Sequence, residues 1–166
     1  MIVDGRTLTP PVWFPPSSRG TRPRKTPARV FVWHWSAGSR GVDGIGIDET
    51  LIRRHLSIHY VLERDGRIVM TADPATTIAY HAGKANRWSI GCEIVGGPGK
   101  DFTPAQYASI GELAEASGLP RVVFDSSKHD LATFRGHCEH RNITPKKIDA
   151  GGRVLRFLAK RWAVAA

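Results

Sequence analysis

The chain has 166 residues, of which 41% are hydrophobic and 23% are charged, a balance typical of one globular domain with a buried core. No apolar run approaches the roughly 18 residues of a membrane-spanning helix, and the first residues lack the apolar stretch of a secretory signal. The net charge of +9 predicts a polyanionic partner, without distinguishing nucleic acid, anionic lipid and cell-wall polymer. Two cysteines are too few for a disulfide framework and are expected to be buried.

The N-terminal segment differs in composition from the rest of the chain. Residues 1–28 hold six of the eleven prolines, and five basic residues against one acid. Because prolines remove backbone donors, we expect an extended basic arm over residues 1–28 without regular strand pairing, followed by one domain over residues 29–166. The arm is interpreted either as a solvated tail or as a segment that binds an anionic envelope surface.

The first half of the domain contains clear strand and turn signals. Residues 30–35 form an unbroken apolar and aromatic run, which predicts a strand covered on both faces. A short helix is expected over residues 48–55, with Asp48 as its cap. Residues 58–63 and 67–70 flank Asp65-Gly66, a pair typical of a hairpin turn.

The second half begins with another buried strand, predicted over residues 88–95. A threonine cap, a first-turn proline and a capping-box glutamine then predict a helix over residues 103–117. Residues 122–124 are expected to form a last strand and residues 153–164 a terminal helix. Strands and helices thus alternate around at least one hairpin, which predicts an α/β fold: a single domain with a central mixed β-sheet flanked by helices.

The seven histidines are the residues best suited to metal chemistry. A catalytic zinc site uses three protein ligands and leaves one position open. His34 falls near the end of the first strand, where it fits either a ligand or a hydrogen-bonded structural residue. Residues 136–149 bring histidines, lysines and Asp149 into one irregular stretch, but their spacing matches no standard zinc motif. The residues alone leave the zinc site open.

Five blocks of sequence stand in an order that characterises a known family. They cover residues 32–38 (VWHWSAG), 57–66 (SIHYVLERDG), 79–93 (with AYHAG and SIGCE), 102–106 (FTPAQ) and 136–151 (with GH and KIDAG). Together they resemble the zinc-dependent N-acetylmuramoyl-L-alanine amidases, a family that includes phage endolysins, muropeptide-recycling amidases and peptidoglycan-recognition proteins. The resemblance extends over residues 30–152 and implies the same fold.

The resemblance also implies a metal site. It makes His34, His137 and Asp149 the ligands of one zinc ion, with the fourth position left to water. The stretch from His137 to Asp149 is longer than the spacing usual in the family, which leaves His140 as a rival to His137. Cys138 is a second rival.

Catalytic and groove residues follow from the same resemblance. Glu93 is expected to act as general base to a zinc-activated water, with Gly91 leaving space beside its carboxylate. Lys147 is expected to stabilise the developing oxyanion. His81 and Asn86 are expected to line the substrate groove, although His81 equally fits a role in fixing its loop.

The activity that the resemblance implies is hydrolysis of the amide bond between N-acetylmuramic acid and L-alanine in peptidoglycan. We favour a monomeric bacteriophage endolysin, made in the host cytoplasm without a signal peptide and acting on the periplasmic wall after membrane permeabilisation. The basic arm would then approach anionic outer-membrane lipid.

Three alternatives remain, one within the same family and two from other classes of protein. A cytosolic amidase would recycle soluble anhydro-muropeptides. A non-catalytic peptidoglycan-binding protein is disfavoured by the presence of Glu93 and Lys147. Nucleic-acid binding rests on charge alone, because no helix-turn-helix signature and no interleaved aromatic and basic residues are found, so no nucleic-acid partner is expected.

Overall fold

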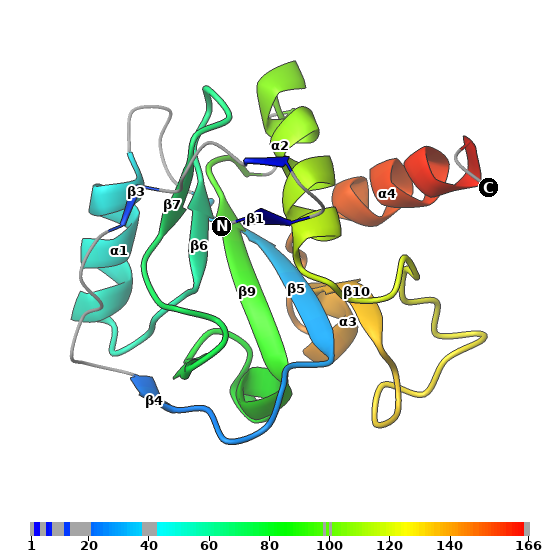
Figure 1. Ribbon diagram of the computed structural model, residues 1–166, viewed down its shortest axis with the longest axis horizontal. Coiled ribbons are helices and arrows are strands. Elements are labelled where there is room, and N and C mark those ends of the chain that lie inside the picture. The colour runs from blue at the N-terminus through cyan, green and yellow to red at the C-terminus, as the bar shows by residue number, and fades with distance from the viewer. Residues whose placement is uncertain are drawn as a thin grey trace.

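Helices and strands alternate around one central sheet (Figure 1). The computed structural model describes residues 21–37, 43–97, 99 and 101–164, together with three short strands nearer the N-terminus. The strands are β1 (Ile2–Val3), β2 (Arg6–Thr7), β3 (Val12–Trp13), β4 (Thr21–Pro23), β5 (Val30–Trp35), β6 (Tyr60–Leu62), β7 (Ile68–Met70), β8 (Thr77–Ala79), β9 (Ser89–Ile94) and β10 (Gly136–Glu139). The helices are α1 (Gly44–Arg53), the 3-10 helix η1 (Gly83–Trp88), α2 (Pro104–Ala116), α3 (His140–Ile143) and α4 (Arg153–Val164).

The central sheet has six strands in the order β10-β5-β9-β6-β7-β3. Strands β10, β5, β9 and β6 run parallel to one another, while β7 returns antiparallel to β6 as the second strand of the hairpin. The expected α/β fold with a central mixed sheet is confirmed. Because the carboxyl ends of the four parallel strands lie at one edge, side chains near those ends meet there, and this edge is where open α/β sheets bind ligands.

The two faces of the sheet carry different residues, since successive side chains of a strand point to opposite sides. On β5, Phe31, Trp33 and Trp35 pack in the main core together with residues of α2 and α4. Val30 and Val32 pack on the other face, against a cluster that includes residues of η1 and α3. His34 continues this second row and therefore lies on the face opposite the main core.

Several predicted elements occur where the sequence places them. β5 spans residues 30–35 as expected, β6 and β7 form the hairpin, and β9 lies within residues 88–95. Helix α2 has the full capping box of Thr103 and Gln106, and α4 covers residues 153–164. Local signals were sufficient for these elements.

Other elements differ from the prediction. Helix α1 begins at Gly44 rather than after Asp48, because Asp43 caps it by accepting a hydrogen bond from the Gly46 amide at 2.9 Å. Residues 122–124 make only an isolated bridge between Val123 and His137. The stretch expected to be irregular instead contains β10 and α3. Within the described residues no helix is both long and apolar enough to cross a bilayer.

The N-terminal prolines do not exclude strand pairing, so that expectation is wrong for the short strands described there. β1 pairs with β2, β3 with β7, and β4 with β8. Strands of two or three residues fit between prolines, and a proline at a strand end disturbs few ladder bonds. The remaining residues of the predicted arm up to residue 20 lie outside the described part of the chain.

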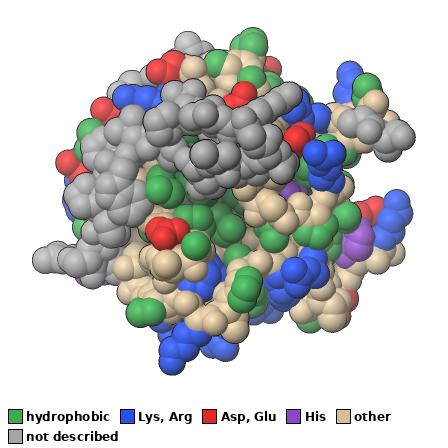
Figure 2. Space-filling view, in the orientation of Figure 1, with side chains coloured by type: hydrophobic (Ala, Val, Ile, Leu, Met, Phe, Trp, Pro, Cys, Tyr) green, Lys and Arg blue, Asp and Glu red, His purple; other side chains and the backbone are tan. Residues whose placement is uncertain are grey.

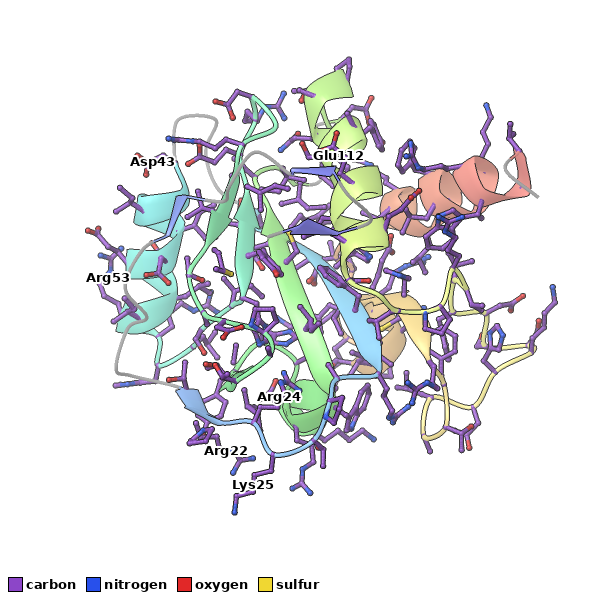
Figure 3. The ribbon with its side chains drawn as sticks, viewed as in Figure 1. Arg22, Arg24, Lys25, Asp43, Arg53 and Glu112 are labelled. Atoms are coloured by element: carbon purple, nitrogen blue, oxygen red, sulfur yellow. The ribbon has the colours of Figure 1, made fainter. Side chains whose placement is uncertain are left out.

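Residues after β4 are held on the domain by Arg24. Its guanidinium donates hydrogen bonds to the carbonyl oxygens of Thr77, Arg87 and Ser89, at 3.1, 3.2 and 2.7 Å. Figure 3 shows Arg24 beside the start of β9, whereas Arg22 and Lys25 lie at the periphery of the molecule. Part of the segment predicted as an arm is therefore packed against the domain.

Candidate metal centre and active site

Three side chains from distant parts of the sequence converge at the carboxyl edge of the sheet. His34 is the fifth residue of β5, His140 follows β10 directly, and Asp149 lies in the loop before α4. His34 Nδ1 lies 3.0 Å from His140 Nδ1 and 3.1 Å from Asp149 Oδ2, and the last two atoms are 3.0 Å apart. All three side chains are buried.

The backbone around this cluster is fixed by buried polar contacts. The Glu139 carboxylate, fully buried at the end of β10, accepts hydrogen bonds from the amides of Gly152 and Val154 at 2.5 and 3.1 Å. The amide of Arg141 donates to the carbonyl oxygen of Asp149 at 2.9 Å. These bonds join the start of α4 and the loop before it to the strand that precedes His140.

The donor atoms of this cluster fit a tetrahedral metal ion. Ligand atoms about 2.0–2.1 Å from such an ion lie about 3.3 Å from one another, close to the 3.0–3.1 Å found here. Two imidazoles and one carboxylate form a ligand set found in catalytic zinc sites, which leave one position open. Among the described residues, His34, His140 and Asp149 form the one such group of metal-ligating side chains.

The pKa values of His34 and Asp149 keep both side chains in the forms that can bind a metal ion. Burial lowers the pKa of His34 to about 4, although its hydrogen bond with Asp149 opposes the shift, so His34 is neutral near pH 7. Burial alone would raise the pKa of Asp149, but hydrogen bonds with His140 and His34 bring it well below the ordinary value. Asp149 is therefore ionised and can balance the charge of a cation.

His137, expected to be a ligand, lies elsewhere. It is fully buried, and its ring centroid is 5.7 Å from that of Phe31, 6.2 Å from that of Trp33 and 5.1 Å from that of Trp162. Neither of its ring nitrogens meets a hydrogen-bond partner among the described residues. The structure thus places His137 in the main core, on the face of the sheet away from the metal-ligating group. His140, the rival considered from the sequence, occupies the position in the cluster.

The register of β10 against β5 explains why His140, and not His137, joins the cluster. His137 pairs with Phe31 and Glu139 pairs with Trp33, so His137 points to the same face as the aromatic core residues of β5. The next residue after Glu139 is His140, which comes level with His34. The unusually long stretch between His137 and Asp149 is the sequence feature that corresponds to this result. Cys138 is buried against Val30 and Val32 and takes no part in the cluster.

Glu93 lies beside the cluster, on the neighbouring strand. β9 pairs with β5 and β6 so that Glu93 stands opposite both His34 and Val61. A cavity of about 300 Å³ opens here, lined by His34, Glu93, His140 and Asp149. Burial and the nearby charge of Asp149 raise the pKa of Glu93 to about 8, an effect that Lys147 partly opposes. In the metal-free protein this carboxyl group therefore exchanges a proton near pH 8, well above the range of an ordinary glutamate.

Cations face this carboxyl group from two sides. Lys147 lines the same cavity, as expected, together with its neighbour Lys146. Arg54, at the end of α1, also lines the cavity and lowers the pKa of Glu93. Nothing in the sequence pointed to Arg54, because the helical pattern of α1 does not show that its carboxyl end borders the cavity.

His81 and Asn86, the two residues expected to contact substrate, instead make hydrogen bonds within the protein. His81 lines the cavity, but its Nδ1 lies 3.0 Å from His34 Nε2 and its Nε2 lies 3.2 Å from Ser89 Oγ. The Asn86 side-chain oxygen accepts hydrogen bonds from the amides of His81 and Ala82 at 3.1 and 2.6 Å. Gly91 leaves room for the His81 ring rather than for the Glu93 carboxylate, since a Cβ there would lie 2.6 Å from His81 Nδ1.

A second cavity, of about 690 Å³, lies on the main-core face of the sheet. Its lining includes Phe31, Tyr60, Ile90 and Leu113 and is mostly apolar. None of the three clustered metal-ligating side chains lines it. The smaller cavity at the carboxyl edge is therefore the candidate active site.

Comparison with known proteins assigns the chain to a family. Residues 24–151 match the protein family described as N-acetylmuramoyl-L-alanine amidase. This match covers most of the chain, and the protein belongs to that family. It is also 33% identical over 112 residues to the 1,6-anhydro-N-acetylmuramyl-L-alanine amidase AmpD of Haemophilus influenzae. That match covers 61% of this chain and 55% of the relative, so the chain spans about half of that protein's length.

Solved structures of an AmpD derivative and of an endolysin share the fold. The crystal structure of an AmpD derivative covers 95% of this chain and 99% of its own, with a TM-score of 0.68 and 24% sequence identity. An endolysin N-acetylmuramoyl-L-alanine amidase from Clostridium intestinale covers 86% of this chain and 87% of its own, with a TM-score of 0.65 and 16% identity. At these identities the likeness shows the fold alone.

Proposed function

We propose that the protein is a zinc-dependent amidase that hydrolyses the bond between N-acetylmuramic acid and L-alanine in peptidoglycan. The observation that carries the proposal is the convergence of His34, His140 and Asp149 beside Glu93 in one open cavity. Membership of the amidase family supports the choice of substrate.

The three ligating residues and Glu93 divide the chemistry between them. Zinc bound by His34, His140 and Asp149 would polarise the scissile carbonyl and make a water molecule nucleophilic near neutral pH. Glu93 accepts a proton from the attacking water and passes it to the nitrogen of the leaving L-alanine. Lys147 lines the same cavity and stabilises the negative charge that develops on the carbonyl oxygen.

The physical form of the substrate separates two versions of this proposal. The endolysin version, in which the protein is made in the cytoplasm and reaches the wall after membrane permeabilisation, draws on the net charge of +9. On the face shown in Figure 2, Lys and Arg side chains gather along the lower edge, and Figure 3 labels Arg22 and Lys25 there. Such an edge would attract anionic lipid or wall polymer. The recycling version, with soluble anhydro-muropeptides as substrates, draws on the similarity to AmpD.

Digestion of purified sacculi, followed by mass spectrometry, tests the activity and the metal together. We expect new L-alanine amino termini, loss of activity with a chelator and recovery on adding zinc. New reducing sugar ends, or full activity of metal-free protein, would contradict the proposal.

Parallel rates on intact sacculi and on soluble anhydro-muropeptides decide between the two versions. A higher rate on sacculi, lowered by added salt and by an Arg22→Gln/Lys25→Gln variant, is expected of the endolysin. A preference for soluble fragments, with no effect of that variant, would favour the recycling amidase.

A further inference from the structure

A chain of hydrogen bonds runs from the metal-ligating group back into the protein. His34 Nδ1 belongs to the cluster, while the other ring nitrogen, Nε2, lies 3.0 Å from His81 Nδ1. His81 Nε2 in turn lies 3.2 Å from Ser89 Oγ. The Ser89 hydroxyl donates to the carbonyl oxygen of Ala85 at 2.8 Å, which ends the chain on the backbone of η1.

The backbone carbonyl at the end sets the direction of every bond in this chain. A hydroxyl has one hydrogen, and Ser89 uses it on Ala85, so Ser89 accepts from His81 Nε2–H. In a neutral imidazole the other nitrogen is then an acceptor, so His81 Nδ1 accepts from His34 Nε2–H. The proton of His34 therefore resides on Nε2, which leaves the lone pair of Nδ1 directed at the cluster.

The surroundings of His81 are built to hold this ring in place. A Cβ at Gly91 would lie 2.6 Å from His81 Nδ1 and 2.7 Å from its Cε1, so only glycine allows the ring to occupy this position. The Asn86 side chain fixes the backbone of the same residue through the His81 amide, at 3.1 Å. Both ring nitrogens of His81 are engaged internally, which leaves only its carbon edge for a substrate.

From these contacts we infer that His81, oriented by Ser89, is a positioning residue that selects the metal-binding tautomer of His34. The inference rests on the proposed metal site and replaces a substrate-contact role for His81. Hydrogen-bond partners of metal-ligating histidines typically change metal affinity or activity by about 10- to 100-fold when removed. Substrate affinity at a fully loaded site should change far less.

Zinc affinity, measured by competition with a chromophoric chelator, tests the inference without relying on activity. We expect His81→Leu to weaken zinc binding by about 10- to 100-fold. His81→Asn places an amide oxygen near the position of Nδ1 and should recover most of the affinity. Gly91→Ala keeps the imidazole of His81 but displaces its ring, so it should also weaken zinc binding. It is the second variant to use if His81→Leu does not fold.

The controls separate positioning from other roles. His55→Asn removes an exposed imidazole at a left-handed position and should leave zinc affinity unchanged. With zinc saturating and a soluble muropeptide as substrate, the KM of His81→Leu should stay near that of the wild type. Wild-type zinc affinity in His81→Leu together with a raised KM would overturn the inference and restore the substrate-contact role. A wild-type protein that binds no zinc would instead overturn the proposed function itself.

Discussion

The burial of Glu93 beside the metal-ligating group affects both the proposed reaction and the free energy of unfolding. Its side chain sits beside the metal-ligating group, where burial and the charge of Asp149 raise its pKa from 4.5 to about 8. Between these two pH values the folded metal-free protein holds a proton that the unfolded chain has released. The contribution of Glu93 to the free energy of unfolding is therefore full near pH 4.5 and is lost as the pH rises towards 8.

Replacing Glu93 with glutamine should separate the two effects. We expect Glu93→Gln to lower kcat by about 10²- to 10⁴-fold, because no group remains to accept the proton of the attacking water. In the presence of a chelator the variant should exceed the wild type in unfolding free energy at pH 8 by at least about 1.4 kcal/mol, the equivalent of one pKa unit. Urea denaturation at pH 5 and pH 8 measures this difference. A wild-type rate in Glu93→Gln would exclude Glu93 as the base.

His137 lies among aromatic core residues and His140 lies in the metal-ligating group. Substitutions at the two positions should therefore have different effects on zinc binding. His140→Ala removes a donor atom of the cluster and should abolish tight zinc binding and activity. His137→Phe replaces a core ring whose nitrogens lack partners among the described residues, so zinc binding and activity should persist. Loss of zinc from His137→Phe and its retention in His140→Ala would return the ligand role to His137.

At the scale of single elements, helix α2 shows how a local signal becomes part of the tertiary structure. Thr103 Oγ1 accepts from the Gln106 amide, and the Gln106 side chain accepts from the Thr103 amide, both at 3.0 Å. The same two side chains donate to the carbonyl oxygens of Arg64 and Val95, at 2.7 and 2.9 Å. The capping box thus joins the start of α2 to the hairpin and to the end of β9.

Removing the cap should destabilise the protein without touching the active site. We expect Thr103→Ala to lower the free energy of unfolding by about 1–2 kcal/mol, while Thr103→Ser retains most of the stability. Zinc affinity should be the same in both variants. Thermal or urea denaturation checks the prediction, and equal stability of the alanine and serine variants would contradict it.

At the scale of the whole molecule, buried neutral histidines make the fold sensitive to acid. Burial lowers the pKa of His59 and of His137 from 6.5 to about 4, although in His59 a hydrogen bond to Thr77 opposes the shift. Between pH 6.5 and pH 4 the unfolded chain binds protons that the folded chain excludes. The stabilisation is complete above pH 6.5 and decreases as the pH falls, by up to about 1.4 kcal/mol per pH unit for each histidine.

The His137→Phe variant also tests this acid sensitivity. Its free energy of unfolding should fall less steeply than that of the wild type between pH 6.5 and pH 4.5. The measurement is made with a chelator present. Protonation of the ligating histidines then changes the free energy of unfolding equally in both proteins, so it cancels when the two are compared. Parallel slopes for the two proteins would show that His137 does not exclude a proton in the folded state.

Local sequence was sufficient for elements whose signals lie within a few residues. The apolar run of β5, the Asp65-Gly66 turn and the Thr103 capping box each determine an element through neighbours along the chain. The family's motifs also single out His34 and Asp149, and in the structure His34 Nδ1 lies 3.1 Å from Asp149 Oδ2.

Tertiary structure alone decided the remaining parts of the site. Whether His137 or His140 joins His34 depends on the register of β10 against β5, because a shift of one residue moves a side chain to the other face of the sheet. Arg54 lines the same cavity as Glu93 only because the carboxyl end of α1 borders that cavity. Gly91 makes room for the His81 ring only because a separate loop places that ring there. These contacts join residues far apart along the chain, and local propensity carries no information about them.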